Sequence, residues 1–238
     1  MKNKLSKYIF LSLFIINAQV IYSQQDNDIK KGLDYSYKSN LDSALFYFQK
    51  YTTANGLNKD VSFYIGNVYF DMLYFDKAIE FYTKTISLNP SDLNAFYNRG
   101  NSYFQLKNYE NALRDFNEVL LKDNKNVDSY YDRSRTFNQL KKYEESISDL
   151  KKVIKLNPNF ELAYYDLGNI YFNQKKYLEA IVNYDKSIEL NSSISDYYFN
   201  RAIAEYNLGF VDDACADFKN AADLGDKDVE QYIEELCR

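Results

Sequence analysis

Residues 161–194, ELAYYDLGNIYFNQKKYLEAIVNYDKSIELNSSI, contain the pattern from which the fold of the whole chain follows. Apolar and small residues recur here at α-helical spacing in two stripes: Tyr164, Leu167, Gly168 and Tyr171, then Ala180, Tyr184, Ser187 and Ile188. The polar residues 173–176 separate the stripes. The stretch therefore predicts a helical hairpin, in which Gly168 and Ala180 are the small residues that let the two helices approach closely.

The same pattern returns every 34 residues along the chain. The small residue of the first helix recurs as Gly32, Gly66, Gly100, Ser134, Gly168 and Ala202. The small residue of the second helix recurs as Ala44, Ala78, Ala112, Ser146, Ala180 and Ala214, and a large residue precedes that helix at Leu41, Phe75, Tyr109, Tyr143, Tyr177 and Val211. Because no insertion interrupts the period, we predict six repeats at about 25–58, 59–92, 93–126, 127–160, 161–194 and 195–228.

With these features the chain resembles the tetratricopeptide-repeat (TPR) proteins. The period, the two small positions, the aromatic residues Tyr103, Tyr109 and Phe116, and the Asn-Pro endings at Pro90 and Pro158 all fit that family. The resemblance implies an all-α, right-handed solenoid of six TPR-like helical hairpins. Residues 229–238, VEQYIEELCR, then form an amphipathic capping helix. On this prediction residues 24–238 are one solenoid without an internal domain boundary.

The first 23 residues are of a different kind. Three lysines within the first seven residues precede an apolar run over residues 8–16, and a more polar segment ends at Ser23. This arrangement is typical of a secretory signal peptide that is cut after Ser23. The apolar run is short for a membrane span. We expect an exported bacterial protein, periplasmic or extracellular, that meets a membrane only through a partner or an uncleaved signal.

The remaining chain is acidic. Removing the three lysines of the signal leaves 26 Lys and Arg against 34 Asp and Glu, a net charge of −8. Such a surface disfavours nucleic-acid phosphates and anionic lipid. One repeat gathers several lysines, which we interpret as a solvated helix face: Lys141, Lys142, Lys151, Lys152 and Lys155. The predicted partner is a protein or peptide, with no nucleic acid and no small-molecule substrate.

The two cysteines, Cys215 and Cys237, lie near the C-terminal end. In an oxidising compartment a disulfide between them would tie the last helix to the last repeat. A loop of this length gives a stabilisation of roughly 3 kcal/mol. Two buried free thiols are the alternative, since Cys is among the most buried residue types. The sequence leaves both open.

Catalytic chemistry has little support in the sequence. The chain contains no histidine, the usual general base and the commonest zinc ligand. The cysteines lack CxxC spacing, and no glycine-rich phosphate-binding motif occurs. Adjacent carboxylates such as Glu144 and Glu145 diverge toward different faces of a helix. We therefore expect no enzyme activity, no cofactor and no metal site.

In TPR proteins the first helices of the repeats line a concave groove that receives an extended peptide or a partner's helix. Carried over repeat by repeat, the resemblance implies groove residues at Phe63, Asn67, Phe70, Tyr97, Asn101, Phe104, Tyr131, Arg135, Asn138, Tyr165, Asn169, Phe172, Phe199 and Tyr206. On one interpretation the asparagines pair with backbone amides of a ligand while the aromatic residues supply apolar contact. On the other, the aromatic residues pack against the neighbouring helix and indicate no particular ligand.

Repeat four departs from its neighbours. Arg135 and Asn138 replace the Asn and Phe of the adjacent repeats. With Arg133 nearby, we predict that Arg135 reads an acidic group of a partner. The alternative is that Asp132 or Asp166 pairs with either arginine inside the chain. The cationic residues with which family members clamp a free C-terminal carboxylate are not matched, so we do not expect a chaperone-tail clamp.

These features predict a non-enzymatic scaffold that binds a peptide or protein partner in its concave groove. The alternative function is a structural subunit of a cell-envelope or secretion assembly that uses its convex face and its ends.

Overall fold

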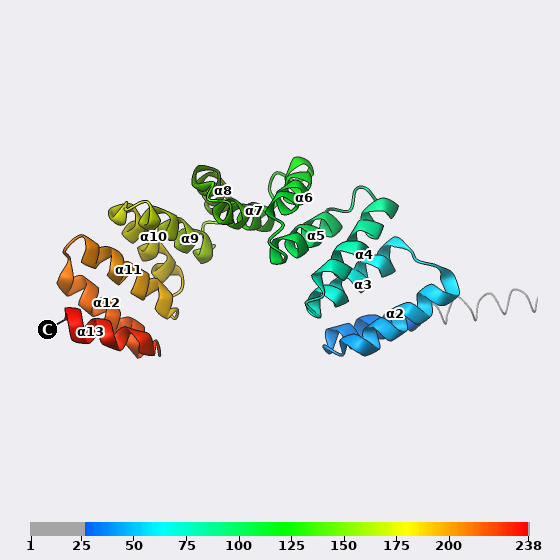
Figure 1. Cartoon of the computed structure of the whole chain (residues 1–238), viewed down its shortest axis with the longest axis horizontal. Helices are drawn as coiled ribbons and strands as arrows, with labels where there is room; N and C mark the ends of the chain where they lie inside the picture. The colour runs from blue at the N-terminus through cyan, green and yellow to red at the C-terminus, as the bar shows by residue number, and fades with distance from the viewer. Residues whose placement is uncertain (1–26, 238) are drawn as a thin grey trace, which may run out of the picture. The chain divides into compact units, whose positions relative to one another are not determined.

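The computed structural model describes residues 27–237, and the regular structure in this range is helical (Figure 1). Residues 27–37 form a first helix. The helices that follow are α2 (Leu41–Asn55), α3 (Lys59–Asp71), α4 (Phe75–Leu88), α5 (Leu93–Gln105), α6 (Tyr109–Lys122), α7 (Val127–Gln139), α8 (Tyr143–Leu156), α9 (Glu161–Asn173), α10 (Tyr177–Leu190), α11 (Ser195–Asn207), α12 (Val211–Asp223), the 3₁₀ turn η1 (Lys227–Val229) and α13 (Glu230–Leu236). The predicted signal peptide lies outside the described residues. Within them, every helix is too short or too polar to cross a lipid bilayer.

The helices repeat with the period of the sequence. From α3 to α11 the first helices begin at 59, 93, 127, 161 and 195, and from α2 to α12 the second helices begin at 41, 75, 109, 143, 177 and 211. The large residue that we expected before each second helix is its first residue. The predicted all-α architecture of paired helices with a C-terminal helix is confirmed.

Local chemistry sets the ends of these helices. Asn58, Asp92 and Asn126 cap α3, α5 and α7, since each side chain accepts a hydrogen bond from the backbone N–H three residues later, at 2.8–3.1 Å. The turns inside the hairpins contain a residue with a left-handed backbone at 39, 73, 107, 141, 175 and 209. Gly209 is the glycine at this position; the others adopt a φ of 57–62° despite their side chains.

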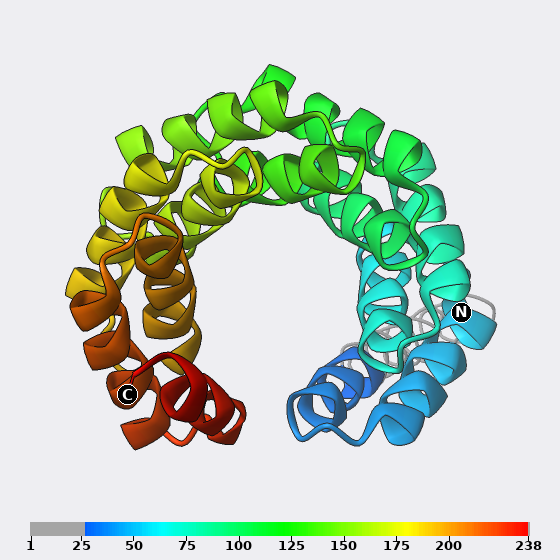
Figure 2. The ribbon, with the colours of Figure 1, turned by 60° about the vertical axis from the view of Figure 1, so that its left-hand side comes forward.

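The contacts of the chain divide it into two compact units, with the boundary in α6 between Glu118 and Val119. The first unit contains residues 27–37, α2 to α5 and the start of α6. The second contains the end of α6 and α7 to α13. Within each unit consecutive hairpins stack side by side: α3 contacts α4 and α5, and α9 contacts α10 and α11 (Figures 1 and 2).

The hairpins of repeats one, two, three and five are each built around a glycine and a buried ring, whereas repeat four has Leu150 at the position of the ring. A Cβ atom added at Gly66 would lie 2.7 Å from the ring of Tyr82, and one added at Gly168 would lie 2.6 Å from the ring of Tyr184. Both rings are buried. The glycines are therefore required by contact between the helices, as the sequence predicted.

Three repeats contain a buried ion pair between their two helices. The pairs are Arg99 with Asp115, Arg133 with Asp149 and Arg201 with Asp217. In each, Nε and Nη2 of the arginine donate to the two carboxylate oxygens at 2.6–2.8 Å. Repeat five has Leu167 and Asn183 at these positions. Asp149 thus holds the guanidinium of Arg133, a partner that the sequence did not suggest.

The C-terminal helix covers the end of the second unit. In both views the red α13 lies beside α12 (Figures 1 and 2). Tyr232, Ile233 and Leu236 pack against a core that contains Phe218. The predicted helix over 229–238 is shorter in the structure, because η1 precedes α13 and α13 ends at Leu236. Cys215 and Cys237 form a disulfide with a Cα–Cα distance of 5.6 Å, which ties the end of α13 to α12.

Replacing both cysteines with serine is expected to loosen this end first. The disulfide closes a loop with a sequence separation of 22, so its loss should reduce stability by roughly 3 kcal/mol. Hydrogen exchange should accelerate in residues 229–237 well before it changes in α9 and α10. Equal protection of residues 229–237 in the variant and the parent protein would contradict a stabilising role for the disulfide.

Candidate functional site

The fourteen candidate groove residues all lie on the first helices of repeats two to six. Twelve of them are half-buried, and two, Arg135 and Tyr206, are exposed. They are aromatic residues, asparagines and one arginine, and a side chain that packs or pairs inside a hairpin needs no ligand to explain it.

The aromatic members pack largely inside their own hairpins. Rings of the first helix contact a ring of the second helix in the pairs Phe63–Tyr82, Tyr97–Phe116, Tyr165–Tyr184 and Phe199–Phe218, with centroids 5.8–6.0 Å apart. A second set contacts the first residue of the second helix: Phe70–Phe75, Phe104–Tyr109 and Phe172–Tyr177, at 5.4–5.6 Å. Packing within the fold thus accounts for these aromatic positions without a ligand.

The asparagines fall into two classes. Oδ1 of Asn67 accepts hydrogen bonds from the Tyr82 hydroxyl at 2.8 Å and from Nδ2 of Asn98 at 3.0 Å. Burial raises the pKa of Tyr82, so its hydroxyl stays protonated and remains a donor. Asn169 is held in the same way by Tyr184, at 2.8 Å. In both residues the side-chain oxygen is used inside the fold, and the Asn169 side chain also hydrogen-bonds to the Tyr165 hydroxyl.

Asn101 belongs to the second class. The next repeat carries Phe116 at the position of Tyr82, and a phenylalanine has no hydroxyl to hold Asn101. Among the residues that the structure describes, the Asn101 side chain makes no hydrogen bond. Both its donor and its acceptor are therefore available to a ligand.

Asn101 and Asn67 lie in the same cavity of the first unit. This cavity, of about 280 Å³, is formed by α3, α4 and α5 and is lined by Asn67, Phe70, Asp71, Tyr82, Asn98 and Asn101. We call it the asparagine cavity. Asp71 is exposed, and partial burial raises its pKa. Three lining residues are among the fourteen candidate groove residues, and Tyr82 and Asn98 were missed. Asp71 is adjacent to Phe70, whereas Tyr82 and Asn98 enter only through the packing of α4 and α5.

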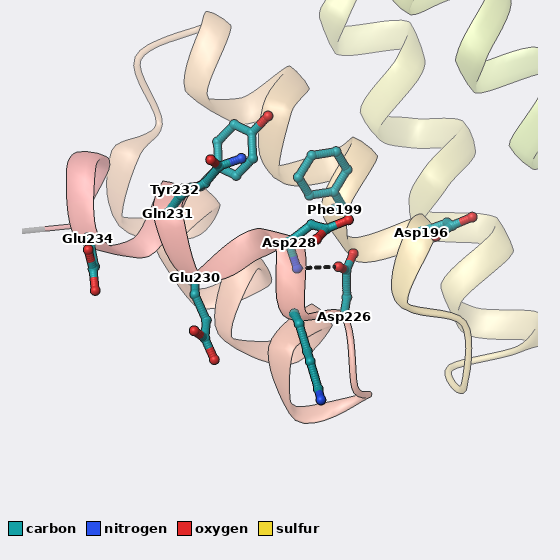
Figure 3. Close-up of a pocket in the computed structure, with 9 residues that line it drawn as sticks. Asp196, Phe199, Asp226, Asp228, Glu230, Gln231, Tyr232 and Glu234 are labelled. Atoms are coloured by element: carbon teal, nitrogen blue, oxygen red, sulfur yellow. Dashed lines mark hydrogen bonds between the residues drawn. The ribbon is translucent and has the colours of Figure 1, made fainter.

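A second cavity, of about 720 Å³, lies at the C-terminal end of the second unit (Figure 3). Its lining comprises Asp196, Phe199, Asp226, Lys227, Asp228, Glu230, Gln231, Tyr232 and Glu234. The rings of Phe199 and Tyr232 meet edge to face at 5.3 Å, and Oδ1 of Asp226 accepts from the backbone N–H of Asp228 at 3.0 Å. Phe199 is the candidate groove residue here. We call this the acidic cavity, since five carboxylates face one lysine.

Arg135 belongs to a cluster of charged residues in the second unit. Its Nη1 lies 3.3 Å from Oδ1 of Asp132, and its guanidinium lies over the ring of Tyr131. The Tyr131 hydroxyl donates a hydrogen bond to Asp166, whose pKa is raised by burial and partly lowered by Tyr131 and Arg135. These contacts correspond to the internal alternative left open by the sequence. Whether Arg135 also reads a partner remains a prediction.

Glu205 is a buried acid beside Arg201 and Asp217. Burial, followed by the charge of Asp217, raises the pKa of Glu205 from 4.5 to about 7. Folding therefore favours the protonated form of Glu205. The contribution of this group to the free energy of unfolding is fully present below pH 4.5, and it is lost as the pH rises through about 7 and the carboxyl ionises. At pH 8 we expect Glu205→Gln to raise the free energy of unfolding by about 1–3 kcal/mol, because the substitution removes a buried charge. At pH 4, where Glu205 is already neutral, the free energy of unfolding should change little. Urea denaturation at both pH values measures this, and an equal effect at both would refute the shifted pKa.

Comparison with known proteins identifies the repeats. Residues 135–175 match a TPR repeat family model, residues 162–193 match a tetratricopeptide repeat model, and residues 38–119 match the model of anaphase-promoting complex, cyclosome, subunit 3. The comparison with curated proteins found no match.

Several solved structures share the fold. A crystal structure of MamA is 24% identical, with a TM-score of 0.65 over 70% of this chain and 97% of that one. YrrB, described as a TPR protein with an unusual peptide-binding site, is 21% identical, with a TM-score of 0.65 over 79% and 98% of the two chains. The pilF protein of Pseudomonas aeruginosa is 17% identical, with a TM-score of 0.73 over 88% and 96%. At these identities the similarity establishes the fold alone.

Proposed function

We propose that this chain, which carries tetratricopeptide repeats at residues 135–193, is a non-enzymatic scaffold that holds a peptide or protein partner against the first helices of its repeats. The observation that carries the proposal is the asparagine cavity. There Asn101 has no partner among the described residues and Asn67 is already fixed by Tyr82 and Asn98.

The geometry of this cavity suits a length of extended peptide. The side-chain amides of Asn67 and Asn101 offer N–H donors to backbone carbonyls, and Phe70 supplies an apolar wall. Because Tyr82 and Asn98 hold Asn67 in place, little rotamer entropy of that side chain is lost on binding. The site is thus preorganised for main-chain recognition, which is the kind of contact that a scaffold makes with varied partners.

We further propose that the protein is exported and meets its partner in the periplasm or outside the cell. The signal-like residues 1–23 support this location. The disulfide between Cys215 and Cys237 supports it independently, since disulfides persist in oxidising compartments.

Affinity capture from an extract of the cell envelope tests the scaffold function. We expect Asn101→Ala to reduce the yield of captured partner about fivefold to tenfold, because hydrogen bonds at a buried contact are lost. Asn111→Ala, on the second helix of the same repeat, is the matched control and should capture as the parent protein does. Undiminished capture by Asn101→Ala would count against binding in this cavity.

A structural subunit is the second candidate, favoured by exposed apolar side chains on second helices. Phe46 of α2 is 59% exposed, and Leu178 and Val182 of α10 are 59% and 66% exposed. Such residues are typical of surfaces that pack against another protein. The same capture experiment discriminates between the two functions: Val182→Lys should abolish co-purification if the second helices form the interface, and should have no effect if the asparagine cavity does.

A further inference from the structure

We propose that the asparagine cavity selects its peptide through one cationic side chain, a lysine or an arginine, whose charge pairs with Asp71. The inference rests on the proposed function, since it concerns the same cavity, and it adds the chemistry of the residue that is recognised.

Asp71 is an exception at its position in the repeat. The corresponding residues of the other repeats are Tyr37, Gln105, Gln139, Asn173 and Asn207, which are all uncharged. Asp71 is also the last residue of α3, where the helix dipole is negative and disfavours a carboxylate. The acid therefore opposes the stability of the helix that carries it, and local structure gives no reason for its presence.

The structure does not neutralise Asp71. Among the described residues it forms neither an ion pair nor a side-chain hydrogen bond, whereas Asp28 is paired with Lys50 and Asp115 with Arg99. None of the other residues that line the cavity is cationic. Asp71 is exposed to solvent on one side, and its partial burial, without a compensating positive charge, raises its pKa. A cation from outside the chain would supply the missing partner, and the end of α3 would add to its attraction.

The size and walls of the cavity fit one long side chain. Its volume of about 280 Å³ lies just below the ~300–1,000 Å³ of sites that enclose a whole small molecule. Phe70 is half-buried and fixed edge to face against Phe75 at 5.4 Å. Its ring offers a surface for the methylene stem of lysine or arginine and an attractive face for the cationic head. Asn67 and Asn101 then hold the main chain of the same peptide.

An acidic peptide residue fits this cavity poorly. The asparagine amides are neutral donors, so nothing in the lining balances a second negative charge beside Asp71. Like charges at close range raise each other's energy, most of all where water is partly excluded. The arrangement therefore discriminates between cationic and anionic peptides as well as attracting the former.

Peptide binding to the purified full chain tests the proposal. The probes are fluorescein-labelled peptide libraries that share one fixed central residue, either Lys, Arg, Leu or Glu, in otherwise mixed neutral sequence. By fluorescence polarisation we expect the Lys and Arg libraries to bind about tenfold more tightly than the Glu library. A difference of this size corresponds to one charge-assisted hydrogen bond between the cationic side chain and Asp71. Asp71→Asn should remove this preference and Asp71→Lys should reverse it. Asp60→Asn, at the other end of α3, removes the same charge and should change nothing.

The remaining outcomes overturn the proposal in distinguishable ways. If the preference for basic peptides survives Asp71→Asn and disappears in Asp228→Asn, the acidic cavity of the second unit is the cation site. If all libraries bind equally and Asn101→Ala weakens them, the scaffold function stands and charge selection by Asp71 fails. If no library binds, the proposed function and this inference fail together.

Discussion

Replacing Arg133 with leucine is expected to lower the free energy of unfolding by about 3–5 kcal/mol. The change removes both hydrogen bonds to Asp149, whose side chain is only 7% exposed, and leaves a carboxylate buried without its cation. Removing one partner of a buried ion pair has a cost of this size, because the remaining charge cannot regain its hydration. Urea denaturation of the purified variant measures the loss.

Repeat five supplies the matched control for this prediction. It carries Leu167 and Asn183 where repeat four has Arg133 and Asp149, and it forms the same hairpin without the ion pair. The double change Arg133→Leu, Asp149→Asn should therefore recover most of the stability that Arg133→Leu loses. The double-mutant cycle isolates the coupling, which we expect to exceed about 2 kcal/mol. Additive effects of the two single changes would show that the pair does not act as a unit.

Gly168→Leu is expected to lower the free energy of unfolding by about 2–3 kcal/mol. Even a Cβ atom at this position would lie 2.6 Å from the Tyr184 ring, and that ring is fully enclosed. The leucine must push α9 and α10 apart or force Tyr184 into an unfavourable rotamer, and this cost exceeds the gain in helix propensity over glycine. Thermal or urea denaturation followed by circular dichroism measures the change.

Two further variants separate overpacking from the mere addition of a leucine. Glu179→Leu places the same side chain on the exposed face of α10 and should alter stability by less than about 0.5 kcal/mol. Gly168→Ala should have an intermediate effect, since repeat six accepts Ala202 at this position. Equal stability of Gly168→Leu and Glu179→Leu would refute the close contact between the helices.

Most of the fold could be predicted because its determinants lie close together in the sequence. The stripe through Gly168 and the stripe through Ala180 belong to single helices, and their spacing is readable without knowledge of any neighbour. The copies at 34-residue intervals then predict the remaining hairpins, and helices α2 to α12 begin where the period places them. Here local propensity and the packing of each hairpin favour the same structure.

The candidate site was predictable only in part. Asn67, Phe70 and Asn101 follow from the family resemblance, but the hydrogen bond from Tyr82 to Asn67 joins two helices and that from Asn98 joins two repeats. Arg133 illustrates the same limit: its sequence neighbours suggested a surface role, whereas its partner Asp149 lies on the next helix. The spacing of apolar residues along a helix does not indicate which polar side chains will form hydrogen bonds or ion pairs with a neighbouring helix.

The number of hairpins, their boundaries and the small residues at their contacts follow from the periodic placement of small and apolar residues. That is so because burial of such residues is non-directional and depends mainly on which face of a helix they occupy. The partners of Asn67 and Arg133, and the absence of one for Asp71 among the described residues, were decided by the tertiary structure. A hydrogen bond or an ion pair requires particular atoms to come within about 3 Å in a suitable direction, and only the packed helices determine that. The unpaired state of Asp71, on which the proposed specificity depends, is therefore a property of the fold and not of the repeat pattern.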